Sequence, residues 1–315
     1  MDIPTVTMTS QAQSIPSDAP TMGSESQAPT RFSYKQLLRN HKISRGMPVE
    51  PEPLQYSDHE LMEEGAILLH KLYSKVVILY PPNPKYNTEK HIVKKWGIDA
   101  VEEEAESMRI AEAAGIRVPH VYAIETASDG RRGIVMDYVD GDMLKHVWQS
   151  LNDEEKTSVK RQLRQVLEKM QSLEPPKDHI GGPRPGDRIR DTRIMMTETA
   201  PAVKDEKGFN DYLLSAVFRA APKYLRAAFA SVLQTDHRIV FTHNDLAPRN
   251  IMYKDGVITI IDWQDGGWYP EYWEYVKFFY RAKGDDLRDD AEDFFPKTYP
   301  LDLVHYIALL HWQPS

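Results

Sequence analysis

The sequence predicts an α+β fold, in which a small antiparallel sheet precedes a larger, mostly helical part. Short runs rich in β-branched and aromatic residues, the composition typical of strands, lie between residues 65 and 139. After Gly141 the composition changes to that of helices, and one long segment carries apolar residues every three to four positions. Strands grouped before helices, rather than alternating with them, favour this class over a parallel α/β sheet.

The bulk composition is that of an ordinary globular protein. Its 315 residues are 41% hydrophobic and 27% charged, with no cysteine, which excludes disulfides and cysteine metal sites. A net charge of −8 argues against nucleic acid or an anionic membrane as the main partner. No window approaches the roughly 18 apolar residues of a membrane span, and the start lacks a secretory signal pattern. We therefore expect a cytoplasmic protein, whose oligomeric state the sequence does not predict.

The first part of the chain is set apart by composition. Residues 1–31 are rich in Ser, Thr, Pro and Gln, and such a segment buries too little apolar surface to fold, so we expect a disordered tail. Residues 32–64 read as an extension with short helices around a proline-punctuated linker. We expect the sheet-rich part over residues 65–139 and the helical part over residues 140–315.

Within the sheet-rich part, five β-rich runs follow Gly65. Residues 66–80 contain two β-rich runs that read as a hairpin, and residues 91–96 form the next strand. A helix rich in Glu and Ala is predicted over residues 102–114. Two further strands follow, at residues 121–125 and 133–139.

The helical part opens with a capped helix. Asn152 is followed by acidic residues, which is typical of a helix start. The apolar residues at three-to-four spacing behind it predict a core-facing stripe; they are Val159, Leu163, Val166, Leu167, Met170 and Leu173. Residues 177–203 are rich in Gly, Pro and Arg and read as a long irregular segment, a kind of segment that is often functional.

The most informative stretch runs from Phe241 to Trp263. Asp245 lies in a loop after an apolar run, and Asn250 follows it by five residues. Two β-rich runs around an Asp-Gly pair then predict a hairpin that returns Asp262 to the side of Asn250. In-line phosphoryl transfer needs a carboxylate that orients the attacking hydroxyl and oxygen ligands for Mg²⁺. Asp245 fits the first task, and Asn250 with Asp262 fits the second.

This string resembles a known family. His243-Asn244-Asp245-Leu246 and Ile261-Asp262-Trp263 are similar to the catalytic and metal loops of the aminoglycoside phosphotransferase family, within the protein-kinase-like superfamily. The continuation from Gly267 to Glu274 resembles a branch of that family found in filamentous fungi. The resemblance implies a protein-kinase-like two-lobed fold and an ATP- and Mg²⁺-dependent kinase that phosphorylates a hydroxyl of a small molecule.

The resemblance also implies a phosphate-binding lysine. Lys94 lies on the third strand, where kinase-like folds place a Lys that contacts the α- and β-phosphates and is held by a helix Glu. Glu104 matches that partner, with Glu103 and Glu106 as nearby rivals. Lys95 takes the place of Lys94 if the register is shifted by one, because strand faces alternate.

The segment Asp137, Tyr138 and Val139 resembles the hinge of the family. An extended hinge offers backbone N–H and C=O groups to adenine, so we expect the base to bind there. One departure concerns the phosphates: the first hairpin has no Gly-x-Gly-x-x-Gly loop, since Gly65 stands alone. That absence favours a small-molecule kinase over a protein kinase, as does the lack of an activation segment after Asp262.

Two questions stay open at this level. A kinase-like protein that binds nucleotide without turnover is the alternative function, although Asp245, Asn250 and Asp262 are all present. The acceptor is not identified, because fold and site type constrain the reaction rather than the substrate. Residues 285–293 carry six acids, which would bind a cationic substrate in drug-phosphorylating relatives but equally fit a solvated helix face.

Overall fold

The computed structural model describes most of the chain beyond residue 60. The described residues are 61–72, 75–97, 101–128, 130–192, 197–215, 217, 221–281 and 286–313. The described residues all belong to one compact unit, Pro53–Ser315. The predicted tail and nearly all of the predicted extension lie outside the described residues.

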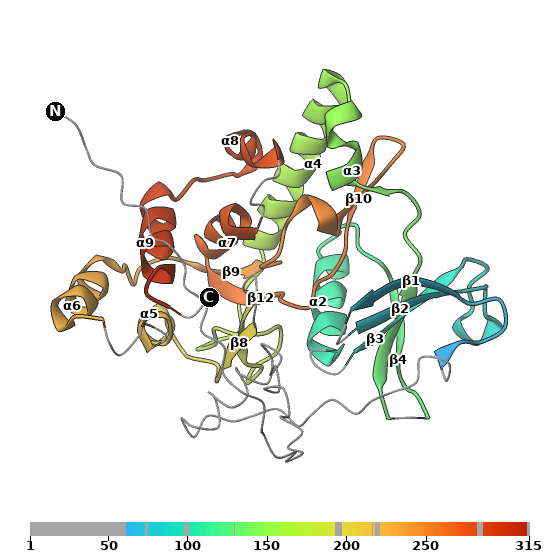
Figure 1. Cartoon of the computed structure of the whole chain (residues 1–315), viewed down its shortest axis with the longest axis horizontal. Coiled ribbons are helices and arrows are strands. Elements are labelled where there is room, and N and C mark those ends of the chain that lie inside the picture. The colour runs from blue at the N-terminus through green and yellow to red at the C-terminus, as the bar shows by residue number, and fades with distance from the viewer. Residues whose placement is uncertain are drawn as a thin grey trace, which may run out of the picture. The chain divides into compact units, whose positions relative to one another are not determined.

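A five-stranded antiparallel sheet forms the first part of the described unit (Figure 1). Its strands are β1 (Ile67–Leu72), β2 (Lys75–Tyr80), β3 (Ile92–Gly97), β4 (Val121–Thr126) and β5 (Arg132–Asp137), in the order β1-β2-β3-β5-β4. The central strand β3 is buried from Ile92 to Trp96, on both faces. The sheet predicted for this region is confirmed.

Helix α2 (Val101–Ala113) connects β3 to β4 and packs on the sheet. Its buried residues include Ala105, Met108 and Ala111, which recur on one face, and also Glu104. A glutamate that is only 4% exposed on this face needs a charged partner, because an unpaired buried carboxylate is costly. A short 3-10 helix, η2 (Pro84–Tyr86), lies between β2 and β3.

The helical part follows β5 through β6 (Asp142–Met143), α3 (Leu144–Val147) and η3 (Trp148–Ser150). Helix α4 (Asp153–Gln171) begins with a capping box in which Asn152 and Glu155 exchange side-chain and backbone hydrogen bonds. The predicted stripe is buried from Val159 to Met170. These residues are core, as the spacing predicts.

The segment expected to be irregular contains a short hairpin. Strands β7 (Ile189–Thr192) and β8 (Thr197–Ala200) pair antiparallel, so the expectation for residues 177–203 is wrong at this point. The high local content of Gly, Pro and Arg concealed two strands of only four residues each.

The rest of the chain builds the largest part of the core. It comprises α5 (Glu206–Ser215), α6 (Lys223–Val232), β9 (Ile239–Thr242), η4 (Pro248–Asn250), β10 (Ile251–Lys254), β11 (Val257–Ile260), β12 (Gly267–Pro270), α7 (Trp273–Arg281), η5 (Asp286–Arg288), α8 (Ala291–Phe294) and α9 (Pro300–Leu310). Its largest fully buried side chains include Trp263, Trp273 and Tyr269. Within the described residues no helix is both long and apolar enough to cross a bilayer.

The predicted catalytic hairpin is present. β10 and β11 pair antiparallel with Ile251 opposite Ile260, around a turn in which Asp255 and Gly256 have φ of 48° and 79°. Positive φ at both central residues is what a two-residue hairpin turn requires, and Asp-Gly supplies it at low cost. The Ile261 N–H donates to the Asn250 carbonyl at 2.9 Å, so the hairpin brings Asp262 beside Asn250.

Candidate active site

The loop after β9 is held by His243. Its Nε2 donates to the Ile261 carbonyl at 3.0 Å, and its Nδ1 accepts the Asp245 N–H at 3.2 Å. These two bonds require a neutral ring with the proton on Nε2, because a carbonyl only accepts and an N–H only donates. His243 is fully buried, and its ring fixes the loop to Ile261, the residue before Asp262.

Glu274, at the start of α7, holds the same loop from the other side. Its Oε2 accepts the N–H groups of His243 at 2.5 Å and of Asn244 at 3.0 Å. Burial raises the pKa of Glu274, and the two N–H groups that donate to it oppose that shift. Asn244 has φ of 69°, a left-handed conformation that asparagine tolerates, and its Nδ2 donates to the Asp265 carbonyl at 3.1 Å. The loop is thus fixed at each residue before Asp245.

Asp245 is 3% exposed, and both of its carboxylate oxygens have partners. Oδ1 accepts from the Arg249 guanidinium, and Oδ2 accepts from the Asn250 Nδ2 at 2.9 Å. The same Nδ2 donates to the Asp245 carbonyl at 2.8 Å. Because the nitrogen of Asn250 is committed to Asp245, its Oδ1 is the atom left to face a cation.

Asp262 lies two residues after the end of β11, with φ of 64°. Its Oδ1 accepts from Lys95 of β3 at 2.5 Å and from Lys75 of β2 at 3.2 Å. Lys95 also donates to Glu104 of α2 at 2.5 Å. Although burial raises the pKa of Asp262, the ammonium groups of Lys95 and Lys75 outweigh it and hold that pKa far below its usual value. The site is therefore a charged cluster of two ammonium groups and two carboxylates.

The donor set here fits Mg²⁺. Asn250 and Asp262 offer one amide and one carboxylate oxygen, and Mg²⁺ in nucleotide sites takes one or two protein oxygens with phosphates and waters as the rest. Within the residues that the structure describes, no group of three or more His, Cys, Asp or Glu side chains is placed to hold a metal.

The prediction that Lys94 pairs with Glu104 is wrong, and Lys95 takes that place. Lys94 points to the other face of β3, where it donates to Glu63 at 2.7 Å and lies 3.4 Å from Glu125. Strand side chains alternate, so one residue of register decides which lysine faces α2. The sequence could not settle this register, because both faces of β3 are buried and the usual apolar alternation is absent.

Two of the three backbone N–H groups of the predicted hinge already donate to carbonyls of the protein. The Asp137 N–H donates to the His120 carbonyl at 3.0 Å, and the Tyr138 N–H donates to the His91 carbonyl at 3.2 Å. Of the three, only the Val139 N–H lacks an acceptor among the described residues. The Asp137 carboxylate accepts the Tyr122 hydroxyl at 2.6 Å, so it braces the end of the strand.

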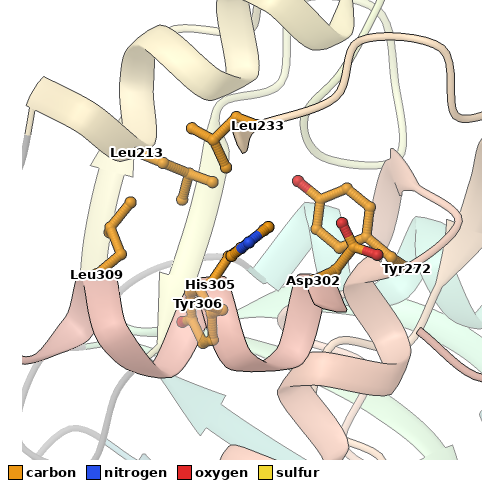
Figure 2. Close-up of a pocket in the computed structure, with 7 residues that line it drawn as sticks. All are labelled: Leu213, Leu233, Tyr272, Asp302, His305, Tyr306 and Leu309. Atoms are coloured by element: carbon orange, nitrogen blue, oxygen red, sulfur yellow. The ribbon is translucent and has the colours of Figure 1, made fainter. Parts of the chain in front are cut away.

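Two other features lie apart from this cluster. A small pocket between α5 and α9, with a space of about 10 Å³, has room for about one water molecule. Figure 2 shows it lined by Leu213, Leu233, Tyr272, Asp302, His305, Tyr306 and Leu309, none of which is a predicted site residue. In the acidic run, Asp290 and Asp293 form ion pairs with Lys160 of α4, at 3.2 and 2.6 Å, and so connect this segment to α4.

The comparisons with known proteins agree with this geometry. The profile of the phosphotransferase enzyme family matches residues 90–297, which include Lys95, Asp245 and Asp262. The chain belongs to that family. A search of curated proteins found no match.

Solved structures share the fold of this family member at low identity. The apo form of a thermostable mutant of aminoglycoside phosphotransferase APH(4)-Ia matches with a TM-score of 0.56 and 14% identity, over 81% of this chain and 88% of that one. A ternary complex of that enzyme with ADP and hygromycin B matches with a TM-score of 0.57 and 12% identity, over 78% and 84%. These matches confirm the protein-kinase-like fold, with a small antiparallel-sheet lobe before a larger, mostly helical lobe.

The sequence missed three residues that the structure brings to the site, and it gave Lys95 only as the alternative to Lys94. Lys75 shares Asp262 with Lys95, Glu274 anchors the loop, and Asp265 accepts from Arg190 at 2.7 Å beneath Asn244. Glu274 lies inside the stretch that resembles the fungal branch, so a signal for it existed. The sequence around Lys75 gives no signal that it belongs to the site, because its partner Asp262 lies 187 residues away.

Proposed function

We propose that this family member is an ATP- and Mg²⁺-dependent kinase that transfers the γ-phosphoryl group to a hydroxyl of a small molecule. The observation that carries the proposal is that one cluster gathers residues from distant parts of the chain. They are Lys95 of β3, Glu104 of α2, Asp245 and Asn250 of the loop after β9, and Asp262 after β11. Asn250 donates to Asp245 through its side chain, and its carbonyl accepts the N–H of Ile261, the residue before Asp262. Lys95 donates to both Asp262 and Glu104. Phosphoryl transfer relies on positioning and charge, which such a braced cluster supplies.

Each residue then has a task. In the reaction, the hydroxyl oxygen forms a bond to the γ-phosphorus, the bond to the bridging oxygen breaks, and ADP leaves. Asp245 orients the hydroxyl and accepts its proton, while Lys95, held by Glu104, contacts the α- and β-phosphates. Asn250 and Asp262 would hold Mg²⁺, which when bound neutralises charge between the β- and γ-phosphates.

The adenine would lie against the hinge. The Val139 N–H is available as a donor to the base, while Asp137 and Tyr138 shape the strand end with their N–H groups already bonded. The solved relatives favour this use of nucleotide, since they include complexes with ADP and with AMP-PNP. We also retain the fungal-type branch and a cytoplasmic location as proposals from the sequence.

The acceptor is proposed at the level of its chemical class. The relatives with TM-scores of 0.50 or more include complexes with hygromycin B and with kanamycin, which are small molecules bearing several hydroxyls. A cationic acceptor remains one candidate, but the described part of the acidic run gives it no support, because Asp290 and Asp293 pair with Lys160.

The test is a phosphotransfer screen with Mg-ATP against a panel of hydroxyl-bearing metabolites, read by mass spectrometry as a gain of one phosphate. Asp245→Asn should remove the product while leaving the thermal unfolding midpoint within a few degrees. Asp255→Asn is the matched control, because Asp255 lies at the exposed hairpin turn and asparagine tolerates its φ of 48°.

Undiminished turnover in Asp245→Asn would contradict the role of Asp245. If the wild type makes no product on a broad panel and Mg-ATP still raises its unfolding midpoint, the outcome favours the nucleotide-binding protein without turnover. If Mg-ATP neither reacts nor stabilises the protein, the kinase proposal itself fails.

A further inference from the structure

The hairpin between β1 and β2 lacks the feature with which kinase-like proteins cover phosphates. Protein kinases place a Gly-rich loop there, whose backbone approaches the triphosphate. In this chain Leu72 and Lys75 are separated by Tyr73 and Ser74, with no glycine among the four. Gly65 precedes β1 and is too far back to serve.

A lysine occupies this end of the hairpin instead. Lys75 is the first residue of β2 and lies opposite Gly97, the last residue of β3. Its side chain is 18% exposed, and its Nζ lies 3.2 and 3.4 Å from the two carboxylate oxygens of Asp262. A side chain of the sheet lobe thus reaches the residue proposed to hold the metal.

Lys95 and Lys75 differ in the number of carboxylates that they contact. Lys95 has two carboxylate partners, Glu104 and Asp262, whereas Asp262 is the one acceptor of Lys75 within the described part of the chain. When Asp262 turns its oxygens to a cation, Lys95 keeps Glu104 but Lys75 loses its partner. A largely buried ammonium then needs another anion close by. The nearest anions in a nucleotide-bound site are the phosphates that share that cation.

From this geometry we propose that Lys75 binds the β- and γ-phosphates of the Mg-nucleotide, replacing the missing Gly-rich loop with a point charge. The proposal rests on the proposed kinase function and extends it to a residue outside the catalytic string. Lys95 then contacts the inner phosphates from β3, and Lys75 contacts the outer ones from the hairpin. Lysine serves this purpose well, because its ammonium is a compact charge on a flexible stem.

The experiment compares the binding of Mg-ATP, Mg-ADP and AMP by titration calorimetry for the wild type, Lys75→Met and Lys94→Met. Lys94→Met is the matched control, since it removes a buried lysine from the same sheet whose partners, Glu63 and Glu125, lie on the other face. Lys75→Met should weaken Mg-ATP and Mg-ADP by about 10- to 100-fold, as for a hydrogen bond to a charged group. AMP should bind within about twofold of wild type, because it lacks the outer phosphates, and Lys94→Met should change none of the three by more than about threefold.

Lys75→Arg should keep most of the Mg-ATP affinity, which a role limited to packing does not predict. Thermal unfolding of each variant shows whether it is folded; if Lys75→Met is not, Lys75→Gln provides the same comparison. Equal weakening of AMP and Mg-ATP, or unchanged Mg-ATP binding in a folded variant, would overturn the role of Lys75. A wild type that binds no Mg-ATP at all would instead contradict the proposed function.

Discussion

The two faces of β3 carry adjacent lysines in similar surroundings but with different partners. Lys94 and Lys95 are 5% and 8% exposed, and each lies within 2.7 Å of a glutamate. The difference lies in the second contact. Lys94 meets Glu125 and the Tyr80 ring, both within the sheet lobe, whereas Lys95 meets Asp262, which is 167 residues away in the helical lobe. Burial and pairing alone therefore do not distinguish the two lysines. The contact of Lys95 with Asp262 in the helical lobe does, and the role that we propose for Lys95 rests on it.

The largest effect is expected from removing Lys95, the lysine that contacts Glu104 and Asp262. Lys95→Met should lower kcat for phosphotransfer by about 10²- to 10³-fold, as for loss of one preorganised charged donor. Lys94→Met should stay within a few-fold of wild type. Steady-state kinetics of both variants with the acceptor found in the screen make the measurement. Equal losses in the two variants would erase the distinction between the faces.

A smaller effect is expected at the residue that positions Lys95. Glu104→Gln keeps a hydrogen-bond acceptor but removes the charge, and Lys95 retains Asp262. We expect about a 10-fold loss of kcat, equivalent to roughly 1.4 kcal/mol. Glu106→Gln, a half-exposed position on the same helix, serves as the control. A loss as large as that of Lys95→Met would mean that Glu104 acts on more than the position of the lysine.

The charged cluster around Asp262 should also make the free energy of unfolding depend on pH. The pKa of Asp262 is lowered in the folded protein, so its contribution is complete above its ordinary value of 3.8 and is lost as the pH falls through the folded value. Asp262→Asn should lower the free energy of unfolding by about 1–2 kcal/mol near neutral pH, because Lys95 keeps one partner.

That difference should shrink below about pH 4, where the unfolded wild type takes up a proton that the folded protein does not. Urea unfolding of wild type and Asp262→Asn across pH 3 to 7 tests this. A difference that stays constant down to pH 3 would show that Asp262 contributes through its shape rather than its charge.

The smallest effect is expected on the face of β3 that carries Lys94. Glu63 is 56% exposed, so its pair with Lys94 is screened by solvent. Glu63→Gln should change the free energy of unfolding by no more than about 0.5 kcal/mol and leave phosphotransfer unchanged. A larger loss, measured by urea unfolding, would indicate that the ion pairs of Lys94 with Glu63 and Glu125 also fix the register of β3.

Local patterns predicted much of this molecule. The Asp-Gly turn and its β-rich flanks are short-range signals, so the hairpin that joins Asn250 to Asp262 was found from the sequence. The stripe of α4 was found for the same reason. Features that depend on tertiary placement were not: the choice between Lys94 and Lys95 needed the register of a strand buried on both faces. The strand that ends at Asp137 was found from the sequence, but the bonds that its N–H group and that of Tyr138 make depend on neighbouring strands and loops.

The most direct test of the account is a crystal structure with AMP-PNP and Mn²⁺, in which anomalous scattering locates the metal. We expect a metal bound by the Asp262 carboxylate and the Asn250 Oδ1, with phosphate oxygens completing its coordination and Lys95 on the α- and β-phosphates. Lys94 should keep Glu63 and Glu125 on the far face. A triphosphate bound on the Lys94 face, or a metal held by neither Asn250 nor Asp262, would contradict it.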